Sequence, residues 1–406
     1  MNKIINKLID KGVLIENPSS VFIDETIDIN NIEPGVKLNQ GTRLYGKNTY
    51  ISKGCIVSKE GPAVIENCVA DKDCVFGSGY FNGSVFLSKS KSGTNSHVRK
   101  GCILEEKSSI AHTCGIKQTI IFPYATLGSL INFCDCMLTG GTSPKNHSEV
   151  GSSFIHFNFT PNQDKATPSL LGNVYEGVFL NKSPIFLGGQ GGMVGPLRLE
   201  FGCTSAAGTI LRRDVLKENR LIFENIHKNI NINQTSMIYL SINKIIKNNL
   251  FYMANLIALK NWYIFVRTNY LNPKINEFAI NTIDSAIEER TKQLKKLSDK
   301  VELGLKILKK DGKNSKLVEL KENFCKNTNT IFDLIIGFSE NKNLFSKGRD
   351  DFLNEFEKEN NGLNYLEKIH SLEENTVKSG VLWLNQIVVD FNEKMSEILN
   401  KFDLGK

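Results

Sequence analysis

Two cationic side chains, Arg99 and Lys117, are separated by three successive six-residue intervals of the sequence. A guanidinium and an ammonium held side by side form a natural phosphate site, because arginine supplies a bidentate pair of donors and lysine a compact charge. The same spacing also fits two unrelated surface cations. The choice between these alternatives depends on whether the chain folds with a six-residue repeat.

Such a repeat runs through residues 98–215, where Val98, Leu104, Ile110 and Ile116 recur at every sixth position among many Gly, Ser, Thr and Asn residues. This period matches neither the 3.6 of a helix nor the 2 of a strand. It is typical of a solenoid in which each hexapeptide forms one side of a triangular coil. Three hexapeptides complete one coil, so the two cations are expected at the same corner of adjacent coils.

Changes in composition and in the spacing of apolar residues divide the sequence into three regions. Residues 1–20 are expected to form an N-terminal helix, ending at Gly12, and a lead-in. Residues 21–215 are expected to form the solenoid, with loops near 77–96 and 140–166 where the repeat breaks. Residues 216–406 are expected to form an α-helical domain with a turn at 309–314. The helices expected there cover 236–248, 251–270, 283–310, 316–338, 344–359 and 374–402.

Several other residues could carry chemistry. Asn158, Phe159 and Lys165, at the second break, could hold sugar hydroxyls and a phosphate oxygen. His147 and His156 are candidate general bases, although a lone histidine is more often structural. The alternation around His156 would point its imidazole outward.

The glycine-rich stretch 187–193 lacks the residue order of a nucleotide-phosphate loop. Its glycines, Gly191 and Gly192 among them, could let a coil corner turn or let an acyl or pantetheine arm lie against the backbone. No Ser-His-Asp order, HExxH motif or paired carboxylates are apparent, and no metal site is expected.

The composition excludes some classes of function. The chain has 406 residues, 40% of them hydrophobic and 23% charged, as in an ordinary soluble protein. Its net charge of +7 is shared between the two halves, which argues against nucleic-acid binding. Nine cysteines without CxxC pairs indicate reduced thiols and a cytoplasmic location. No uninterrupted apolar run reaches the length of about 18 residues needed for a membrane span.

The solenoid region resembles the left-handed β-helix acetyltransferase domain of the bifunctional bacterial enzyme that makes UDP-N-acetylglucosamine. The resemblance lies in HVRKGCILEEKSSIAHTCGIK, FIHFNFTPNQDKATPSLLG and FLGGQGGMVGPLRLEFGCTSAAGTILRRDV. It implies a left-handed parallel β-helix of hexapeptide repeats, a homotrimer, and acetyl-CoA or another acyl-CoA as donor. It also implies that Arg99 and Lys117 hold a sugar 1-phosphate, and that Ala207 belongs to the closing coil.

The same resemblance places Asn158, Phe159 and Lys165 in the sugar pocket, but three departures qualify it. Ser129 stands where the family has its catalytic histidine, Gly115 replaces a glutamate, and Phe159 replaces a tyrosine. Past Val215 the sequence has no clear equivalent of the basic residue that helps to hold coenzyme A in this family, and the family's N-terminal nucleotidyltransferase domain has no counterpart. Because losing a general base costs about 10²–10⁴-fold in rate, His147 or His156 would have to substitute.

Three functions therefore stay open. The first is a trimeric protein that binds a phosphorylated amino sugar or nucleotide sugar and acts as an acyl-CoA-dependent N-acetyltransferase. The second is a catalytically inactive β-helix scaffold or sensor, favoured by Ser129 and the helical appendage. The third, a relative of sugar-1-phosphate nucleotidyltransferases, has little support without the catalytic domain.

Overall fold

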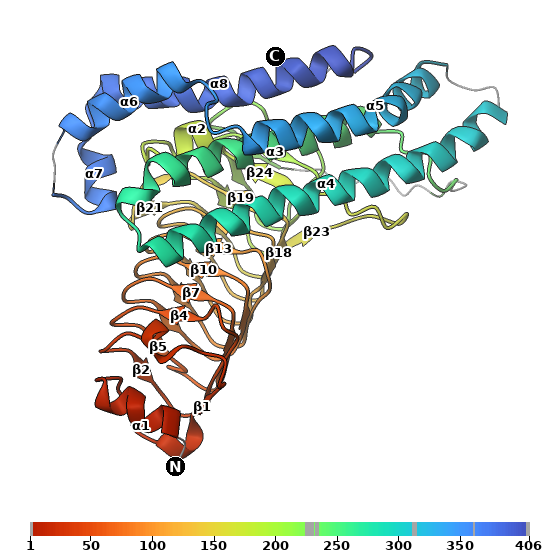
Figure 1. Ribbon diagram of the computed structural model, residues 1–406. Coiled ribbons are helices and arrows are strands. Elements are labelled where there is room, and N and C mark those ends of the chain that lie inside the picture. Colours follow the sequence, from red (N-terminus) through yellow and green to blue (C-terminus); the bar gives the residue numbers. More distant parts are fainter. Residues whose placement is uncertain (1–2, 224–230, 232–234, 311–314, 360–361, 403–406) are drawn as a thin grey trace.

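The computed structural model describes residues 3–223, 231, 235–310, 315–359 and 362–402. It confirms the expected fold: a left-handed parallel β-helix of about 11 turns is followed by a helical region. Figure 1 shows the coils stacked from the N-terminus upward, with the long helices lying across one side of the upper coils.

Each coil contributes one short strand to each of three parallel sheets, named here after their first strands. The β1 sheet contains β1 (Phe22–Ile23), β3 (Thr42–Tyr45), β6 (Ala63–Glu66), β9 (Gly79–Asn82), β12 (Ser96–Val98), β15 (Gly115–Lys117), β18 (Asn132–Cys134), β23 (Ile155–Phe157), β26 (Gly192–Val194) and β29 (Ile210–Leu211). The β2 sheet contains β2 (Lys37–Leu38), β5 (Ile56–Val57), β8 (Val75–Phe76), β11 (Lys91–Ser92), β14 (Ser109–Ile110), β17 (Thr126–Leu127), β22 (Glu149–Val150), β25 (Phe186–Leu187), β28 (Thr204–Ser205) and β30 (Leu221–Ile222). The β4 sheet contains β4 (Tyr50–Ile51), β7 (Val69–Ala70), β10 (Val85–Phe86), β13 (Ile103–Leu104), β16 (Ile120–Ile121), β19 (Cys136–Leu138), β24 (Ser169–Leu171) and β27 (Arg198–Leu199).

The six-residue repeat marks the interior of the coils. Val98, Leu104, Ile110 and Ile116 are all buried, and each lies on a different side or coil of the prism. Since a side chain from every sixth residue points inward, the sheets pair in register from coil to coil, as in Val98 opposite Ile116. The interior is therefore a thin column of stacked apolar side chains.

The prediction of a loop near 77–96 is wrong, because the coils continue there through β9, β10, β11 and the start of β12. Phe76, Phe81 and Phe86 fill the interior, with ring centroids 4.7–5.9 Å apart in edge-to-face contacts. These three residues are five positions apart and not six, so the six-residue period is interrupted here although the coils continue.

In residues 140–166 the chain does leave the regular coil. An antiparallel hairpin, β20 (Gly141–Ser143) and β21 (Asn146–His147), projects between the β4 and β2 sheets. Strands β22 and β23 then rejoin the coil, and an irregular segment follows β23. Helix α2 (Val174–Gly177) lies beyond it.

The N-terminal helix α1 (Lys3–Asp10) buries Ile5 and Leu8 against the first coil. The short 3-10 helices η1 (Pro18–Ser20) and η2 (Ile29–Asn31) follow it. After the solenoid come α3 (Ile242–Phe265), η3 (Arg267–Asn269), α4 (Pro273–Lys310), α5 (Ser315–Glu340), α6 (Ser346–Lys358), α7 (Tyr365–Ser371) and α8 (Glu374–Ile398).

Three details of the helical region differ from expectation. Helix α4 begins at Pro273 and not at residue 283. The helices expected at 236–248 and 251–270 are largely one helix, α3, which runs through Asn248 and Asn249. Both asparagines are buried, and Asn249 donates hydrogen bonds to the carbonyls of Ile245 and Ala166 instead of ending the helix. Helix α7 was not expected. The turn expected at 309–314 falls mostly on residues 311–314, which lie outside the described residues.

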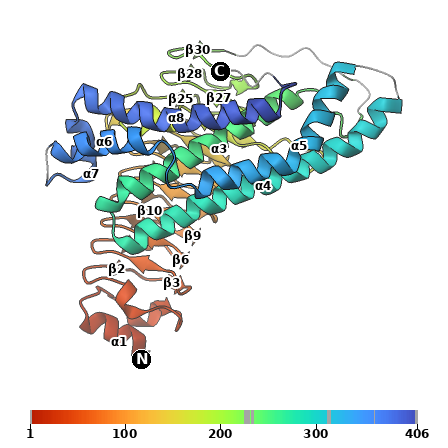
Figure 2. The same ribbon diagram turned by 45° about the horizontal axis from the view of Figure 1, so that its top comes forward.

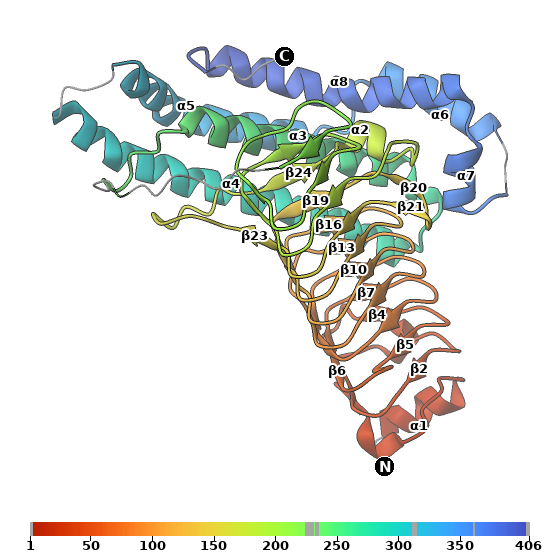
Figure 3. The same cartoon turned by 180° about the vertical axis from the view of Figure 1, so that it is seen from behind.

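The helices cover the outer face of the β4 sheet. Side chains of that sheet, including Val85, Ile103 and Met137, share one apolar core with α3, α4 and α8. Figures 2 and 3 show these helices along one side of the coils. Helix α4 thus borders the corner between the β1 and β4 sheets. No helix of the described residues is long and apolar enough to cross a membrane.

Candidate functional site

Arg99 and Lys117 lie at the corner between the β1 and β4 sheets, in adjacent coils. The Arg99 backbone N–H donates to the Ile116 carbonyl at 2.9 Å, and Lys117 pairs with Cys134 of the next coil. The structure therefore stacks the two cations as the repeat predicts. The Arg99 side chain is exposed and that of Lys117 half-buried.

Both cations have donors available for an anion. Arg99 Nη2 donates to Cys134 Sγ at 3.1 Å, and burial raises the pKa of that thiol, so the sulfur is neutral and leaves the guanidinium charge uncompensated. Within the described residues the Lys117 ammonium makes no hydrogen bond or ion pair. This corner therefore carries net positive charge facing solvent.

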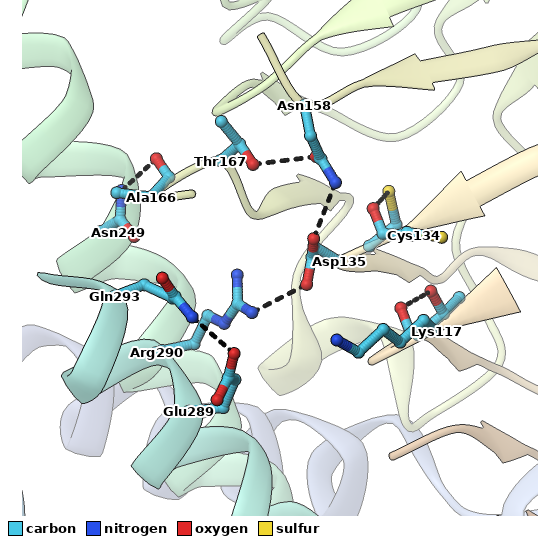
Figure 4. A network of polar contacts seen from close by, with 12 residues as sticks. Lys117, Cys134, Asp135, Asn158, Ala166, Thr167, Asn249, Glu289, Arg290 and Gln293 are labelled. Carbon is cyan, nitrogen blue, oxygen red and sulfur yellow. Dashed lines mark hydrogen bonds and ion pairs between the residues drawn. The ribbon is translucent and has the colours of Figure 1, made fainter. Parts of the chain in front are cut away.

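A polar network holds the corner next to Lys117 (Figure 4). Asp135 accepts hydrogen bonds from Asn158 Nδ2 at 3.0 Å and from Arg290 Nη2 of α4 at 2.7 Å. Thr167 Oγ1 donates to Asn158 Oδ1 at 2.8 Å, which fixes the amide from its other end. Sequence reasoning found Asn158 but missed Asp135 and Arg290, because no local pattern links a coil corner to a helix so far along the chain.

Phe159 and Lys165 lie on the irregular segment after β23. The Phe159 ring is 71% exposed, and the Lys165 side chain is also exposed. The segment itself is anchored, because Tyr239 Oη donates to Asp164 Oδ2 at 2.8 Å. In the described part of the chain, neither side chain makes a hydrogen bond, ion pair or ring contact with Arg99 or Lys117.

The expected outward orientation of His156 is wrong. The imidazole is buried inside the coil, with Nε2 at 2.8 Å from Ser169 Oγ and the ring edge-on to Phe133. Burial lowers its pKa to about 4. The strand takes this register because Phe154 and His156 occupy the interior positions and Ile155 the outer one. This histidine therefore cannot contact a ligand on the outer face.

His147 lies at a different corner from the cations. It belongs to the β20–β21 hairpin between the β4 and β2 sheets, whereas Arg99 and Lys117 lie between the β1 and β4 sheets. Its Nδ1 is 2.9 Å from the Pro144 carbonyl oxygen, and its Nε2 is 3.9 Å from Glu149 Oε2. The hairpin thus carries it away from the corner where sequence reasoning expected it to act.

The outer face of the β1 sheet lies between the cations and the opposite corner. His97, Gly115 and Asn132 occupy equivalent outward positions in three adjacent strands. A Cβ placed on Gly115 would meet only the Ile131 carbonyl oxygen, at 4.0 Å, so open space lies above it. The absence of a side chain at Gly115 therefore leaves room on the outer face beside Lys117.

At the corner between the β2 and β1 sheets, Ser129 and His112 are in contact. Ser129 Oγ is 2.8 Å from His112 Nδ1, and both residues are accessible to solvent. His112 comes from the preceding coil, since the Leu130 backbone N–H donates to the His112 carbonyl. Sequence reasoning missed His112, although the coil spacing that stacks Arg99 on Lys117 also stacks these two residues.

The same corner continues through small residues in the following coils. The Gln190 N–H donates to the Ser152 carbonyl at 2.8 Å, and the Gly208 N–H to the Gly189 carbonyl at 2.9 Å, so Ser152, Gly189 and Ala207 are aligned. Ala207 is exposed.

The neighbouring Gly191 and Gly192 differ, because both are buried. A Cβ on Gly192 would meet the Phe157 ring at 2.3 Å, so that ring covers it. The aligned small residues of the corner, and not these two glycines, are open to a ligand.

A separate groove of about 1020 Å³ lies along the corner that carries Arg99, between the earlier coils and the first half of α4. Its walls carry Lys47, Lys100 and Lys274 together with Glu66 and Glu277, and several asparagines. Lys100 directly follows Arg99, so the groove begins beside the candidate phosphate site.

Comparison with known proteins gives one informative match, and no family model matches the chain. Over 213 residues the chain is 26% identical to Bifunctional protein GlmU of Lawsonia intracellularis (strain PHE/MN1-00). The matched region covers 52% of this chain and 41% of GlmU. The chain thus spans less than half the length of this curated relative.

A hexapeptide transferase family protein from Anaplasma phagocytophilum is 13% identical and covers 68% of this chain and 90% of that one. Its TM-score of 0.14 is too low to support structural equivalence. The six-residue repeat, the parallel solenoid and the similarity to GlmU together show that this chain resembles the hexapeptide-repeat acetyltransferases.

Proposed function

We propose that this protein binds a phosphorylated or nucleotide-linked amino sugar on the outer face of the β1 sheet and transfers an acyl group from a coenzyme A thioester to the sugar amine. The observation that carries the proposal is the stack of Arg99 and Lys117, which leaves two cations facing solvent at one corner. Similarity to GlmU supports the choice of reaction.

The phosphate is held by Arg99 and Lys117, and the sugar ring lies over Gly115. An arginine offers paired donors to two phosphate oxygens, and a lysine adds a point charge. The space above Gly115 gives room for the ring, and the exposed Asn132 amide beside it can bond to sugar hydroxyls. Asn158, fixed by Asp135, borders the pocket.

The acyl donor lies along the corner of small residues, Ser152, Gly189 and Ala207. A Cβ on Gly189 would come within 2.9 Å of the Ser152 carbonyl oxygen, so this position takes no side chain. The exposed Ala207 adds only a methyl group, and a corner without long side chains suits a narrow pantetheine arm. The donor supplies an activated carbonyl, and backbone N–H groups of the corner can stabilise the developing oxyanion.

We propose further that the protein is a homotrimer in which neighbouring copies complete the site. Leu130, Ile155 and Phe159 are 54%, 40% and 71% exposed around the outer face of the β1 sheet. Apolar side chains gathered beside a polar site are typical of a surface that another protein covers. Light scattering coupled to size exclusion tests this, because a monomer at micromolar concentration would contradict a site shared between copies.

Calorimetry with glucosamine 1-phosphate tests the binding step. Arg99→Ala and Lys117→Ala are each expected to weaken binding about ten- to a hundredfold, the loss of a hydrogen bond to a charged group. Arg43→Ala is the matched control, because Arg43 is an exposed arginine on the same sheet, in an earlier coil. Equal affinity of wild type and Arg99→Ala would overturn the phosphate site. Thiol release from acetyl-CoA with this sugar then tests transfer.

A second candidate function is a sugar-phosphate sensor or scaffold without turnover. It is favoured by Ser129, where the resembling family has a histidine, and by the groove between the coils and α4, which offers a second surface for a ligand or partner. Binding of the sugar phosphate with no thiol release from any acyl-CoA would support this function over the first.

A further inference from the structure

The contact between Ser129 and His112 joins two side chains from adjacent coils at an accessible corner. Ser129 Oγ lies 2.8 Å from His112 Nδ1. The Ser129 backbone N–H also donates to Ser152 Oγ at 3.2 Å, which ties the serine to the following coil. The serine is thus oriented from both sides.

This pair lies where the proposed reaction needs a proton acceptor. It is on the corner that carries Ser152, Gly189 and Ala207, which is the proposed binding surface of the acyl donor. Across the β1 sheet from it is Lys117, at the far end of the three-residue strand β15. Three residues of strand span about 10 Å, a length that a sugar ring and its phosphate can bridge.

We infer that Ser129 and His112 together accept the proton of the sugar amine, an inference that rests on the proposed acyl transfer. A serine hydroxyl alone is a poor base, because taking a proton requires it to lose its own. An imidazole nitrogen in hydrogen-bond contact removes that proton as the other arrives. The pair therefore does the work of the single histidine that the resembling family has at the position of Ser129.

The amine proton passes through both side chains to the leaving thiolate. The amine nitrogen attacks the thioester carbonyl carbon, a C–N bond forms and the C–S bond breaks. The amine proton moves to Ser129 Oγ, and the hydroxyl proton moves to His112 Nδ1. The imidazolium then gives its proton to the leaving thiolate, which restores both side chains.

Three other histidines of the β-helix are placed less well for this role. His156 is buried and His147 is at another corner. His97 is exposed on the same outer face, one strand from Gly115, but its ring packs edge-on against Tyr80 at 5.7 Å. His97 is therefore the rival that an experiment must exclude.

The test measures kcat and KM for acetyl transfer from acetyl-CoA to glucosamine 1-phosphate in the full-length protein. Ser129→Ala and His112→Gln are each expected to lower kcat about 10²-fold or more with KM little changed, and His97→Gln to leave kcat near the wild-type value. The double variant His112→Gln/Ser129→His is expected to regain activity, because an imidazole at position 129 accepts the proton directly.

Three outcomes would overturn the inference. His112→Gln could keep wild-type kcat, or His97→Gln could lose it instead. Intact mass after mixing with acetyl-CoA could show an acetyl group on Ser129, which would make the serine a nucleophile. A wild type that binds the sugar phosphate but releases no thiol would instead overturn the proposed transfer, and this step with it.

Discussion

The Arg290 guanidinium of α4 donates a 2.7 Å hydrogen bond to the Asp135 carboxylate at the β-helix corner beside Lys117. Their side chains are only 4% and 11% exposed. The charge of Asp135 is therefore balanced from the helical region and not from solvent. This pair makes the helices part of the structure that holds the candidate site.

Removing one member of this pair is expected to destabilise the protein strongly. Asp135→Ala leaves the Arg290 charge buried without its partner, which costs about 3–5 kcal/mol of unfolding free energy. Urea unfolding followed by circular dichroism measures the loss. Lys292→Ala on the same helix is the control, since its ion pair with Glu288 is more than half exposed and should contribute little. A similar small effect in both variants would contradict the prediction.

Replacing both partners with apolar residues is expected to cost less than replacing one. Asp135→Leu with Arg290→Met removes both charges and keeps much of the volume, so neither desolvation penalty remains. Asn158 loses one acceptor in this variant. The same urea series should place the double variant above Asp135→Ala in stability, and a larger loss in the double variant would show that packing and not charge decides the cost.

Glu105 is expected to make the protein less stable as the pH rises from about 4.5 to 7. Burial raises its pKa to about 7, with the neighbouring Glu106 adding to the rise, while Arg267 opposes it. Between these pH values the folded state holds a proton that the unfolded chain releases. The contribution of Glu105 to stability is therefore complete below its ordinary pKa of 4.5 and is lost as the pH rises through 7. Glu105→Gln should remove this slope in urea unfolding, and exposed Glu60→Gln should keep it.

His156 is expected to act in the opposite direction between about pH 6.5 and 4. Burial lowers its pKa to about 4, so the unfolded chain binds a proton in this range and the folded state does not. Its stabilising contribution is therefore present above pH 6.5 and lost as the pH falls through 4. The NMR signals of the imidazole should show no titration between pH 8 and 5. A midpoint near 6.5 would mean that the ring is accessible.

Replacing Gly115 or Gly101, which lie in adjacent coils, with alanine is expected to change stability in opposite directions. Gly115 has room for a Cβ, so Gly115→Ala should keep or raise the melting temperature, worth about 0.4–1 kcal/mol. Gly101 has a φ of +88°, and a Cβ there would lie 2.3 Å from Gln118 Nε2. Gly101→Ala should therefore lower stability by about 1–2 kcal/mol. Differential scanning calorimetry on both variants checks the difference, and equal shifts would contradict it.

The fold could be predicted from sequence because the repeat encodes it directly. Val98, Leu104, Ile110 and Ile116 each fill the same kind of interior position, so spacing alone gives the coil and the stacking of Arg99 on Lys117. The coils at 77–96 were missed because their interior residues Phe76, Phe81 and Phe86 are five positions apart and not six. A side of the coil can thus lose one residue and still pair in register with its neighbours, and a fixed period does not detect it.

The candidate site could be predicted only in part, because it depends on direction and on distant contacts. His156 was expected outside, but the register set by Phe154 turns it inward. Arg290 meets Asp135 across 155 residues of sequence, and no periodicity within either segment indicates that contact. His112 could have been found, since it precedes Ser129 by one coil.

The first half of α4 also reaches back to the beginning of the coils. Lys274 Nζ donates to Asn31 Oδ1 at 2.7 Å across 243 residues of sequence, and Asn272 donates to the Tyr50 hydroxyl at 3.0 Å. During synthesis the early coils therefore leave the ribosome before the helix that covers the outer face of their β4 sheet has been made. That apolar face is exposed to solvent until α4 is complete.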